Sequence, residues 1–223
     1  MRPVCHPPVT APIILASTSL RRRELLALLK VPFELADPPF VEHPRPDAPP
    51  DQQAITFARE KARSVAARFP ERLVLGSDTL IALGPVVFGK PAGDADARRI
   101  LRSLSGRVHV IHTAVALVRL CDGVQEVGME SVLVRLRELS DAQIEAYIRS
   151  GEGTGKAGAY SIQGAGAALI ADVSGDFTAA VGLPLRLAEE LLKRCGVTVG
   201  VDVDDLYRAR PYPNWSLFAS SNG

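Results

Sequence analysis

The sequence predicts an α/β fold built on a mixed sheet. Short apolar runs that stop at polar turns are followed by segments in which apolar residues recur with helical spacing. Two longer runs, 108–120 and 124–136, are rich in β-branched residues and are separated by a tight turn, which predicts a long antiparallel hairpin. No repeat or linker interrupts the 223 residues, so we expect one domain.

The first elements are a strand, a polar turn and a helix. Residues 13–15 form a short buried-strand run, and the turn at 17–19 leads into helical spacing over 20–29. A second strand is expected at 32–36, before a proline-rich loop at 37–50.

A helix and a strand follow this loop. Asp51 is placed to cap an amphipathic helix that reaches Phe69. The apolar run 73–75 stops at Gly76-Ser77-Asp78-Thr79, so we expect Asp78 at the end of a strand. A hairpin-like segment punctuated by Gly84 lies beyond it.

Further helices flank the long hairpin. One is expected at 94–104, and Ser140 with Gln143 has the form of a capping box for a helix that ends at Arg149. Six glycines lie between 151 and 166, a density that favours the approach of a ligand to the backbone over packing. Residues 183–195 form the last clear helix.

The composition excludes several classes of protein. Twenty-six Lys and Arg residues against 25 Asp and Glu give a formal net charge of +1, without the basic excess that a general nucleic-acid binder needs. No apolar run approaches the roughly 18–20 residues that cross a bilayer, so we expect neither a signal peptide nor a membrane anchor. Cys5, Cys121 and Cys195 form no CxxC pair, which is typical of reduced cytoplasmic thiols.

The turn at 17–19 is the first candidate site. The free N–H groups of a helix N-terminus attract anions, and the guanidinium groups of Arg21 and Arg22 can form bidentate bonds to phosphate. These arginines oppose the helix dipole, and a bound anion would remove that conflict. The alternative is an ordinary serine cap with the arginines in water.

Asp78 is the second candidate. A carboxylate at the carboxyl end of a strand can hold a divalent cation or a water molecule, although Gly-Ser-Asp is also a common turn sequence. Lys61, Lys90 and Lys156 lie in polar or glycine-rich contexts and would add positive charge beside it; the alternative for each is a solvated lysine.

Two other patterns are rejected. Residues 153–158 match the GxGxxG pattern of dinucleotide-binding folds, but no helical pattern follows them. The segment is not a phosphate-binding P-loop either, because Lys156 is followed by Ala where that motif has Ser or Thr. His109 and His112 lie on opposite faces of a predicted strand, so we do not expect them to bind a metal together.

Seven ordered blocks resemble one protein family. They are LASTSLRR at 15–22, REKA at 59–62, GSDT at 76–79, GKP at 89–91, LSG at 104–106, KAGAYSIQG at 156–164 and VGLPL at 181–185. Over roughly residues 12–195, the chain resembles the Maf family of nucleoside triphosphate pyrophosphatases.

This resemblance implies an elongated α/β fold related to inosine triphosphate pyrophosphatases, with a central cleft. It also implies a divalent metal, Mg²⁺ or Mn²⁺, a cytoplasmic location and a homodimer. The implied reaction is hydrolysis of a nucleoside triphosphate to the monophosphate and pyrophosphate. We expect the family domain at 12–198, with terminal extensions at 1–11 and 199–223.

The matching positions imply roles for single residues. Asp78 would be the proton acceptor and, with Glu42, a metal ligand; the alternative for Glu42 is a surface carboxylate. Arg21, Thr79 and Gln163 match the branch that acts on dTTP and UTP, not the one that acts on 7-methyl-GTP, and would set specificity. The residues expected to bind phosphate are Ser17, Ser19, Arg22, Lys61, Lys90 and Lys156.

Two other functions remain open. One is a regulatory protein of septum formation that binds a nucleotide without turnover, and the other is a pyrophosphatase for modified pyrimidine nucleotides. The tail is also open, because its four aromatic residues could dock on the body, dock on a second subunit or form a loose end: Tyr207, Tyr212, Trp215 and Phe218.

Overall fold

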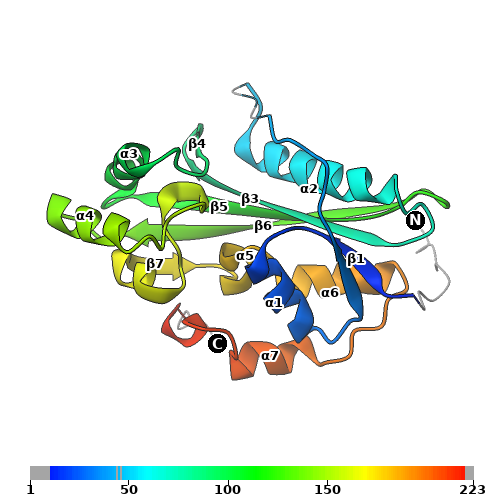
Figure 1. Cartoon of the computed structure of the whole chain (residues 1–223). Coiled ribbons are helices and arrows are strands. Elements are labelled where there is room, and N and C mark those ends of the chain that lie inside the picture. The colour runs from blue at the N-terminus through cyan, green and yellow to red at the C-terminus, as the bar shows by residue number, and fades with distance from the viewer. Residues whose placement is uncertain (1–10, 44, 46, 219–223) are drawn as a thin grey trace.

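A mixed seven-stranded sheet runs through the structure, a computed structural model that describes residues 11–43, 45 and 47–218 (Figure 1). Its strands in chain order are β1 (Ile13–Ala16), β2 (Phe33–Ala36), β3 (Val74–Leu83), β4 (Val86–Phe88), β5 (Val108–Arg119), β6 (Val124–Leu136) and β7 (Ile170–Ser174). The order across the sheet is β2-β1-β3-β5-β6-β7, and β4 pairs with β3 outside this path. β1 is parallel to β2 and β3, and the other pairs are antiparallel, which confirms the predicted mixed sheet.

Helices cover both faces of this sheet. One face carries α2 (Pro50–Ala66), and Figure 1 shows the remaining helices on the other face or at one end of the sheet. They are α1 (Leu20–Leu28), α3 (Asp94–Leu104), α4 (Asp141–Arg149), α5 (Phe177–Val181), α6 (Leu185–Arg194) and α7 (Val203–Ala209). Two apolar cores result, a smaller one under α2 and a larger one on the opposite face.

The contact between α2 and β3 is unusually close because small residues meet there. A Cβ at Gly76 would lie 2.3 Å from the carbonyl oxygen of Ala58 and 2.7 Å from the amide nitrogen of Ala62. Only glycine fits this position, and its absence of a side chain lets α2 lie directly on the strand. The same turn of α2 therefore brings Lys61, the residue before Ala62, to this face of β3.

The structure corrects the predicted strand end at Asp78. β3 continues to Leu83, and its residues 74–82 pair without interruption with 110–118 of β5. Gly76-Ser77-Asp78-Thr79 resembles a turn in sequence, but this long ladder keeps it extended. Asp78 consequently lies in the middle of a strand.

Helix boundaries differ in smaller ways. α2 begins at Pro50 with Pro49 as its N-cap, so Asp51 lies in the first turn and does not cap the helix, and Phe69 lies beyond its end. Proline is favoured at the first helical position, which explains the earlier start. The capping box of Ser140 and Gln143 is confirmed. The short helices α5 and α7 were not predicted.

Within the described residues, no helix has the length and apolar character needed to cross a membrane. Cys121 is an exposed free thiol and Cys195 a buried one, while Cys5 lies outside the described residues. His109 and His112 contact different partners, Tyr160 and Ser131, as expected for side chains that do not share a site.

Candidate active site

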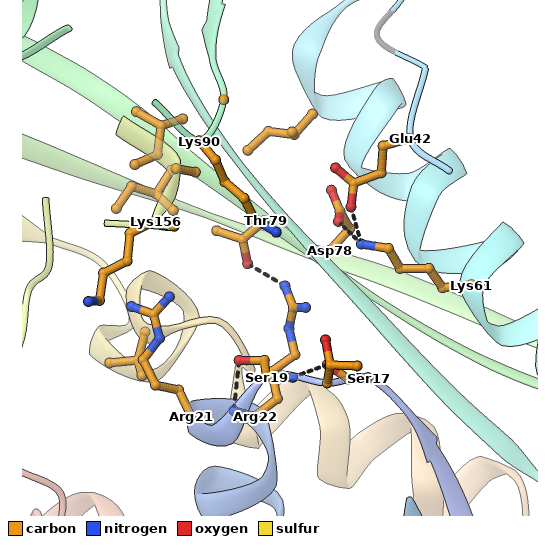
Figure 2. A pocket seen from close by; sticks show the side chains of 18 of the residues that line it. Ser17, Ser19, Arg21, Arg22, Glu42, Lys61, Asp78, Thr79, Lys90 and Lys156 are labelled. Atoms are coloured by element: carbon orange, nitrogen blue, oxygen red, sulfur yellow. Dashed lines mark hydrogen bonds and ion pairs between the residues drawn. The ribbon is translucent and has the colours of Figure 1, made fainter. Parts of the chain in front are cut away.

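A gap along one edge of β3 creates the site. β1 pairs with β3 only as far as Gly76, and β4 pairs with it only from Ile81. Residues 77–80 therefore have no strand partner on this edge within the described part of the chain. A pocket of about 460 Å³ opens at the gap (Figure 2), and this volume suits a small-molecule ligand.

The turn between β1 and α1 forms one wall of the pocket. Ser17 Oγ accepts a hydrogen bond from the Ser19 amide at 3.1 Å, and Ser19 caps α1 by accepting from the Arg22 amide. Ser17 and Ser19 both line the pocket, so the N-terminus of α1 faces it. The serine cap is real, but it does not exclude an anion, because the helix end remains beside the cavity.

Arg22 does not extend into water. Its Nε donates to the carbonyl oxygen of Gly182 at 3.0 Å, and its Nη2 donates to Thr79 Oγ1 at 3.1 Å. Gly182 has a φ of +129°, a conformation that favours glycine, and its carbonyl also accepts from Ser77 Oγ. These contacts fix the guanidinium group at the pocket wall.

Lys61 joins two carboxylates on the opposite side. Its Nζ lies 2.5 Å from both Asp78 Oδ1 and Glu42 Oε1, as Figure 2 shows. The exposed side-chain fractions are 11% for Lys61, 5% for Asp78 and 40% for Glu42. The Lys61–Asp78 pair is therefore buried, and its partners depend strongly on each other.

Asp78 has one oxygen that no protein group satisfies. Oδ2 is buried and has no hydrogen-bond partner among the described residues. Burial raises the pKa of Asp78 above its ordinary value, while the nearby charges of Lys61 and Arg22 act in the opposite direction. A buried, unsatisfied carboxylate oxygen beside a cavity indicates a site for a cation or a water molecule.

Positive charge dominates the lining. Five cationic side chains face three carboxylates, a formal excess of two positive charges. Figure 2 shows Arg21 and Lys156 together on the side away from Lys61, where burial and the charge of Arg21 both lower the pKa of Lys156. Like charges that converge on one cavity favour an anion between them.

The family relationship is clear once the chain is compared with known proteins. A family model described as Maf-like protein matches residues 12–195. The chain belongs to the Maf family. It is 46% identical over 187 residues to the dTTP/UTP pyrophosphatase of Moorella thermoacetica, covering 84% of this chain and 96% of that protein.

Another relative and one solved structure were also matched. The dTTP/UTP pyrophosphatase of Deinococcus radiodurans is 42% identical over 193 residues, covering 86% of this chain and 97% of that protein. The structure of the Staphylococcus aureus Ham1 protein aligns with a TM-score of 0.41 and 14% identity, covering 56% of this chain and 71% of that chain.

The pocket of this Maf protein brings most of the predicted site residues together. Those that line it are Ser17, Ser19, Arg21, Arg22, Glu42, Lys61, Asp78, Thr79, Lys90 and Lys156. Gln163 is not part of the lining, although its neighbour Ile162 is. The side chain of Gln163 instead lies beside the hydroxyl of Tyr212 in the C-terminal tail, where it favours the ionised form of that group.

Besides Thr18 in the predicted turn, two polar residues of the lining received no role from the sequence, Asp37 and Tyr160. Asp37 directly follows β2, whose parallel pairing with β1 brings its carboxyl end to the pocket. The carboxyl ends of parallel strands were the available signal for this residue. Tyr160 also lines the pocket and hydrogen-bonds to His109 at 2.7 Å, a contact that sequence spacing does not reveal.

Close contacts within the glycine-rich segment 151–166 account for some of its glycines, while five of its residues line the pocket: Gly155, Lys156, Ala157, Tyr160 and Ile162. Glu152 accepts from the amides of Ala165 and Gly166 at 2.8 Å, and a Cβ at Gly164 would lie 2.1 Å from its carboxylate. A Cβ at Gly153 would lie 2.2 Å from the carbonyl oxygen of Ala159. Within this segment, Gly155 is the glycine that lines the pocket.

Proposed function

We propose that the chain hydrolyses dTTP and UTP to the nucleoside monophosphate and pyrophosphate. Its relatives at 42–46% identity carry this activity in their names. The observation that carries the proposal is a buried carboxylate with an unsatisfied oxygen in a pocket with five cationic side chains. The cations suit a phosphorylated substrate, and the carboxylate suits the acceptance of a proton from water.

In the proposed reaction, water attacks the α-phosphorus, the bond from this phosphorus to the α,β-bridging oxygen breaks, and pyrophosphate leaves. Asp78 accepts the proton of the attacking water. Because burial raises its pKa, Asp78 is a stronger base than an exposed aspartate, while Lys61 and Arg22 favour its ionised form.

The phosphate groups are bound by Ser17, Ser19, Arg22, Lys61, Lys90 and Lys156. Arg22 is already fixed by Gly182 and Thr79, so little side-chain freedom is lost when substrate binds. Positioning and neutralisation of charge supply most of the rate in this class of reaction.

Asp78 and Glu42 would hold the divalent cation, Mg²⁺ or Mn²⁺. The buried, unpartnered Oδ2 of Asp78 fits such an ion, because both ions prefer oxygen ligands. Among the described residues, no group of three or more His, Cys, Asp or Glu side chains is placed to hold a metal ion. When bound, the cation neutralises phosphate charge and activates the phosphorus.

Thr79 supports a preference for uracil and thymine, which we propose it shares with Arg21 and Gln163. Thr113 Oγ1 donates to the carbonyl oxygen of Ala179, so in the 3.0 Å contact between the two hydroxyls Thr79 is the donor. Thr79 also accepts from Arg22, and its remaining lone pair can only accept. An acceptor suits the N3–H of uracil and thymine, which cytosine lacks.

Pyrophosphate release tests the proposal. Purified protein with Mg²⁺ or Mn²⁺ is expected to release pyrophosphate from dTTP and UTP faster than from CTP, 7-methyl-GTP and the purine triphosphates, and chelation by EDTA should stop the release. Asp78→Asn should lower kcat by about 10²–10⁴-fold, the usual contribution of a proton acceptor. Asp122→Asn, which makes the same exchange in the exposed turn between β5 and β6, should leave kcat unchanged.

Each alternative function predicts a different result. Binding of UTP without release of pyrophosphate would favour the regulatory protein of septum formation. Faster release of pyrophosphate from a modified pyrimidine triphosphate than from dTTP and UTP would favour the pyrophosphatase for modified nucleotides. The homodimer, the cytoplasmic location and the domain boundaries at 12–198 stay predictions, and the sedimentation coefficient of the purified chain tests the first of them.

A further inference from the structure

The C-terminal tail, which lies beyond the residues matched by the family model, packs firmly on the body. Trp215 is 4% exposed and stacks on Phe177 with ring centroids 5.7 Å apart. Tyr207 donates a hydrogen bond to Asp176 Oδ2 at 2.7 Å. Of the alternatives left open for the tail, the structure supports docking on the body.

Tyr212 connects this tail to two elements of the pocket. Its hydroxyl donates to Glu24 Oε2 at 2.5 Å, and Glu24 lies on α1 three residues after Arg21. The side chain of Gln163 lies beside the same hydroxyl and favours its ionised form, which acts against the rise in the pKa of Tyr212 caused mainly by burial. Tyr212 is 7% exposed, so water does not compete strongly for the bond to Glu24.

Asn214 holds the backbone on both sides of Gln163. Its Nδ2 donates to the carbonyl oxygens of Ile162 at 3.3 Å and of Gly164 at 3.2 Å. The φ of Asn214 is +66°, a left-handed conformation that asparagine tolerates better than most residues. One side chain of the tail therefore bridges the two residues that flank Gln163.

We propose that Tyr212 and Asn214 are positioning residues that hold Gln163 and α1 at the base-recognition end of the pocket. The inference rests on the proposed function, in which Arg21 and Gln163 recognise the base. Ile162 and Arg21 line the pocket and belong to the two segments that Tyr212 and Asn214 contact. The tail, which lies outside residues 12–195 matched by the family model, thus supports the base-recognition end of the pocket.

Two variants remove these contacts with little other change. Tyr212→Phe keeps the ring and removes the hydroxyl that bonds to Glu24 and lies beside Gln163. Asn214→Gly removes both amide bonds and keeps a residue that adopts a positive φ. Tyr207→Phe is the matched control, since it removes a tail hydroxyl that bonds to Asp176 and Thr178, away from Gln163.

The readouts separate positioning from stability. Tyr212→Phe and Asn214→Gly are expected to raise KM for UTP by about 3–10-fold, the effect of about one lost hydrogen bond, with kcat within twofold of wild type. The preference for UTP over CTP in kcat/KM should fall in both. Tyr207→Phe should lower Tm to a similar extent and leave KM and this preference unchanged.

Binding of α,β-imido-UTP, measured by calorimetry, makes the outcome independent of turnover. If wild type binds this analogue but releases no pyrophosphate from UTP or dTTP, the proposed function fails. A 3–10-fold weaker Kd for the analogue in the two variants would still support the positioning role. If both variants keep wild-type KM, Kd and base preference while Tm falls, the tail is only a structural cap and the inference is overturned. Absence of binding by wild type overturns both proposals.

Discussion

Replacing Lys61 with Met tests the arrangement between α2 and β3 most directly. Met keeps the apolar stem and removes the ammonium group that lies 2.5 Å from both Asp78 and Glu42. The pair with the 40% exposed Glu42 contributes at most about 1 kcal/mol. Loss of the pair leaves the buried charge of Asp78 without a partner, which lowers the free energy of unfolding by about 3–5 kcal/mol. We expect this loss at pH 8, equivalent to a Tm about 6–20 °C lower.

The loss should depend on pH. Burial already raises the folded-state pKa of Asp78 above 3.8, and removal of Lys61 raises it further. Between 3.8 and this raised pKa the folded chain binds more protons than the unfolded chain, so the stability of the variant falls as the pH rises through that window. Urea unfolding should therefore give a larger deficit at pH 8 than at pH 5.

A second substitution provides the control. In Lys61→Met/Asp78→Asn the buried charge is absent, and most of the lost free energy of unfolding should return. A deficit below about 1 kcal/mol at pH 8, or one that the second substitution does not reduce, would refute the view that Lys61 chiefly compensates Asp78.

Three other predictions concern stability. Gly76→Ala should lower the free energy of unfolding by about 1–3 kcal/mol, because the new methyl group meets the backbone of α2, whereas Gly93→Ala, which meets nothing within 4 Å, should cost less than about 1 kcal/mol in the same urea titration. Arg22→Lys should lower Tm by about 2–8 °C, since lysine cannot replace both guanidinium hydrogen bonds. Burial lowers the pKa of His109 from 6.5 to about 4, so on acidification the unfolded chain binds the proton before the folded chain does. The free energy of unfolding should therefore fall by about 3 kcal/mol as the pH drops from 6.5 to 4. His109→Gln should remove this part of the pH dependence, and an unchanged dependence of unfolding free energy on pH in the variant would contradict the prediction.

Local patterns predicted the elements that depend on local physics. The capping box at Ser140 and the long hairpin formed by β5 and β6 follow from side-chain spacing and turn chemistry, and both are confirmed. The residues of the candidate site were found as separate polar blocks. Their assembly in one pocket, apart from Gln163, required the sheet order, which no local pattern contains.

The errors arose where tertiary contacts outweigh local preference. Gly-Ser-Asp-Thr lies within β3 because β5 pairs without interruption with residues 74–82. The glycines at 153 and 164 reflect close contacts with the carbonyl of Ala159 and the carboxylate of Glu152, and a glycine pattern alone does not distinguish these from ligand contacts. α5 has five residues, too few to show a helical period.

The side chains of β3 alternate between the two faces of the sheet, and this alternation limits how the site tolerates insertions and deletions. Ser77 and Thr79 face Arg22 and Gly182, whereas Asp78 faces Lys61. Since neighbouring strand residues point to opposite faces, insertion or deletion of one residue here would exchange hydroxyls for the carboxylate on both faces at once. The spacing of this strand is thus constrained as strictly as its composition, and homologous proteins that keep the chemistry should vary in length only in the connecting loops.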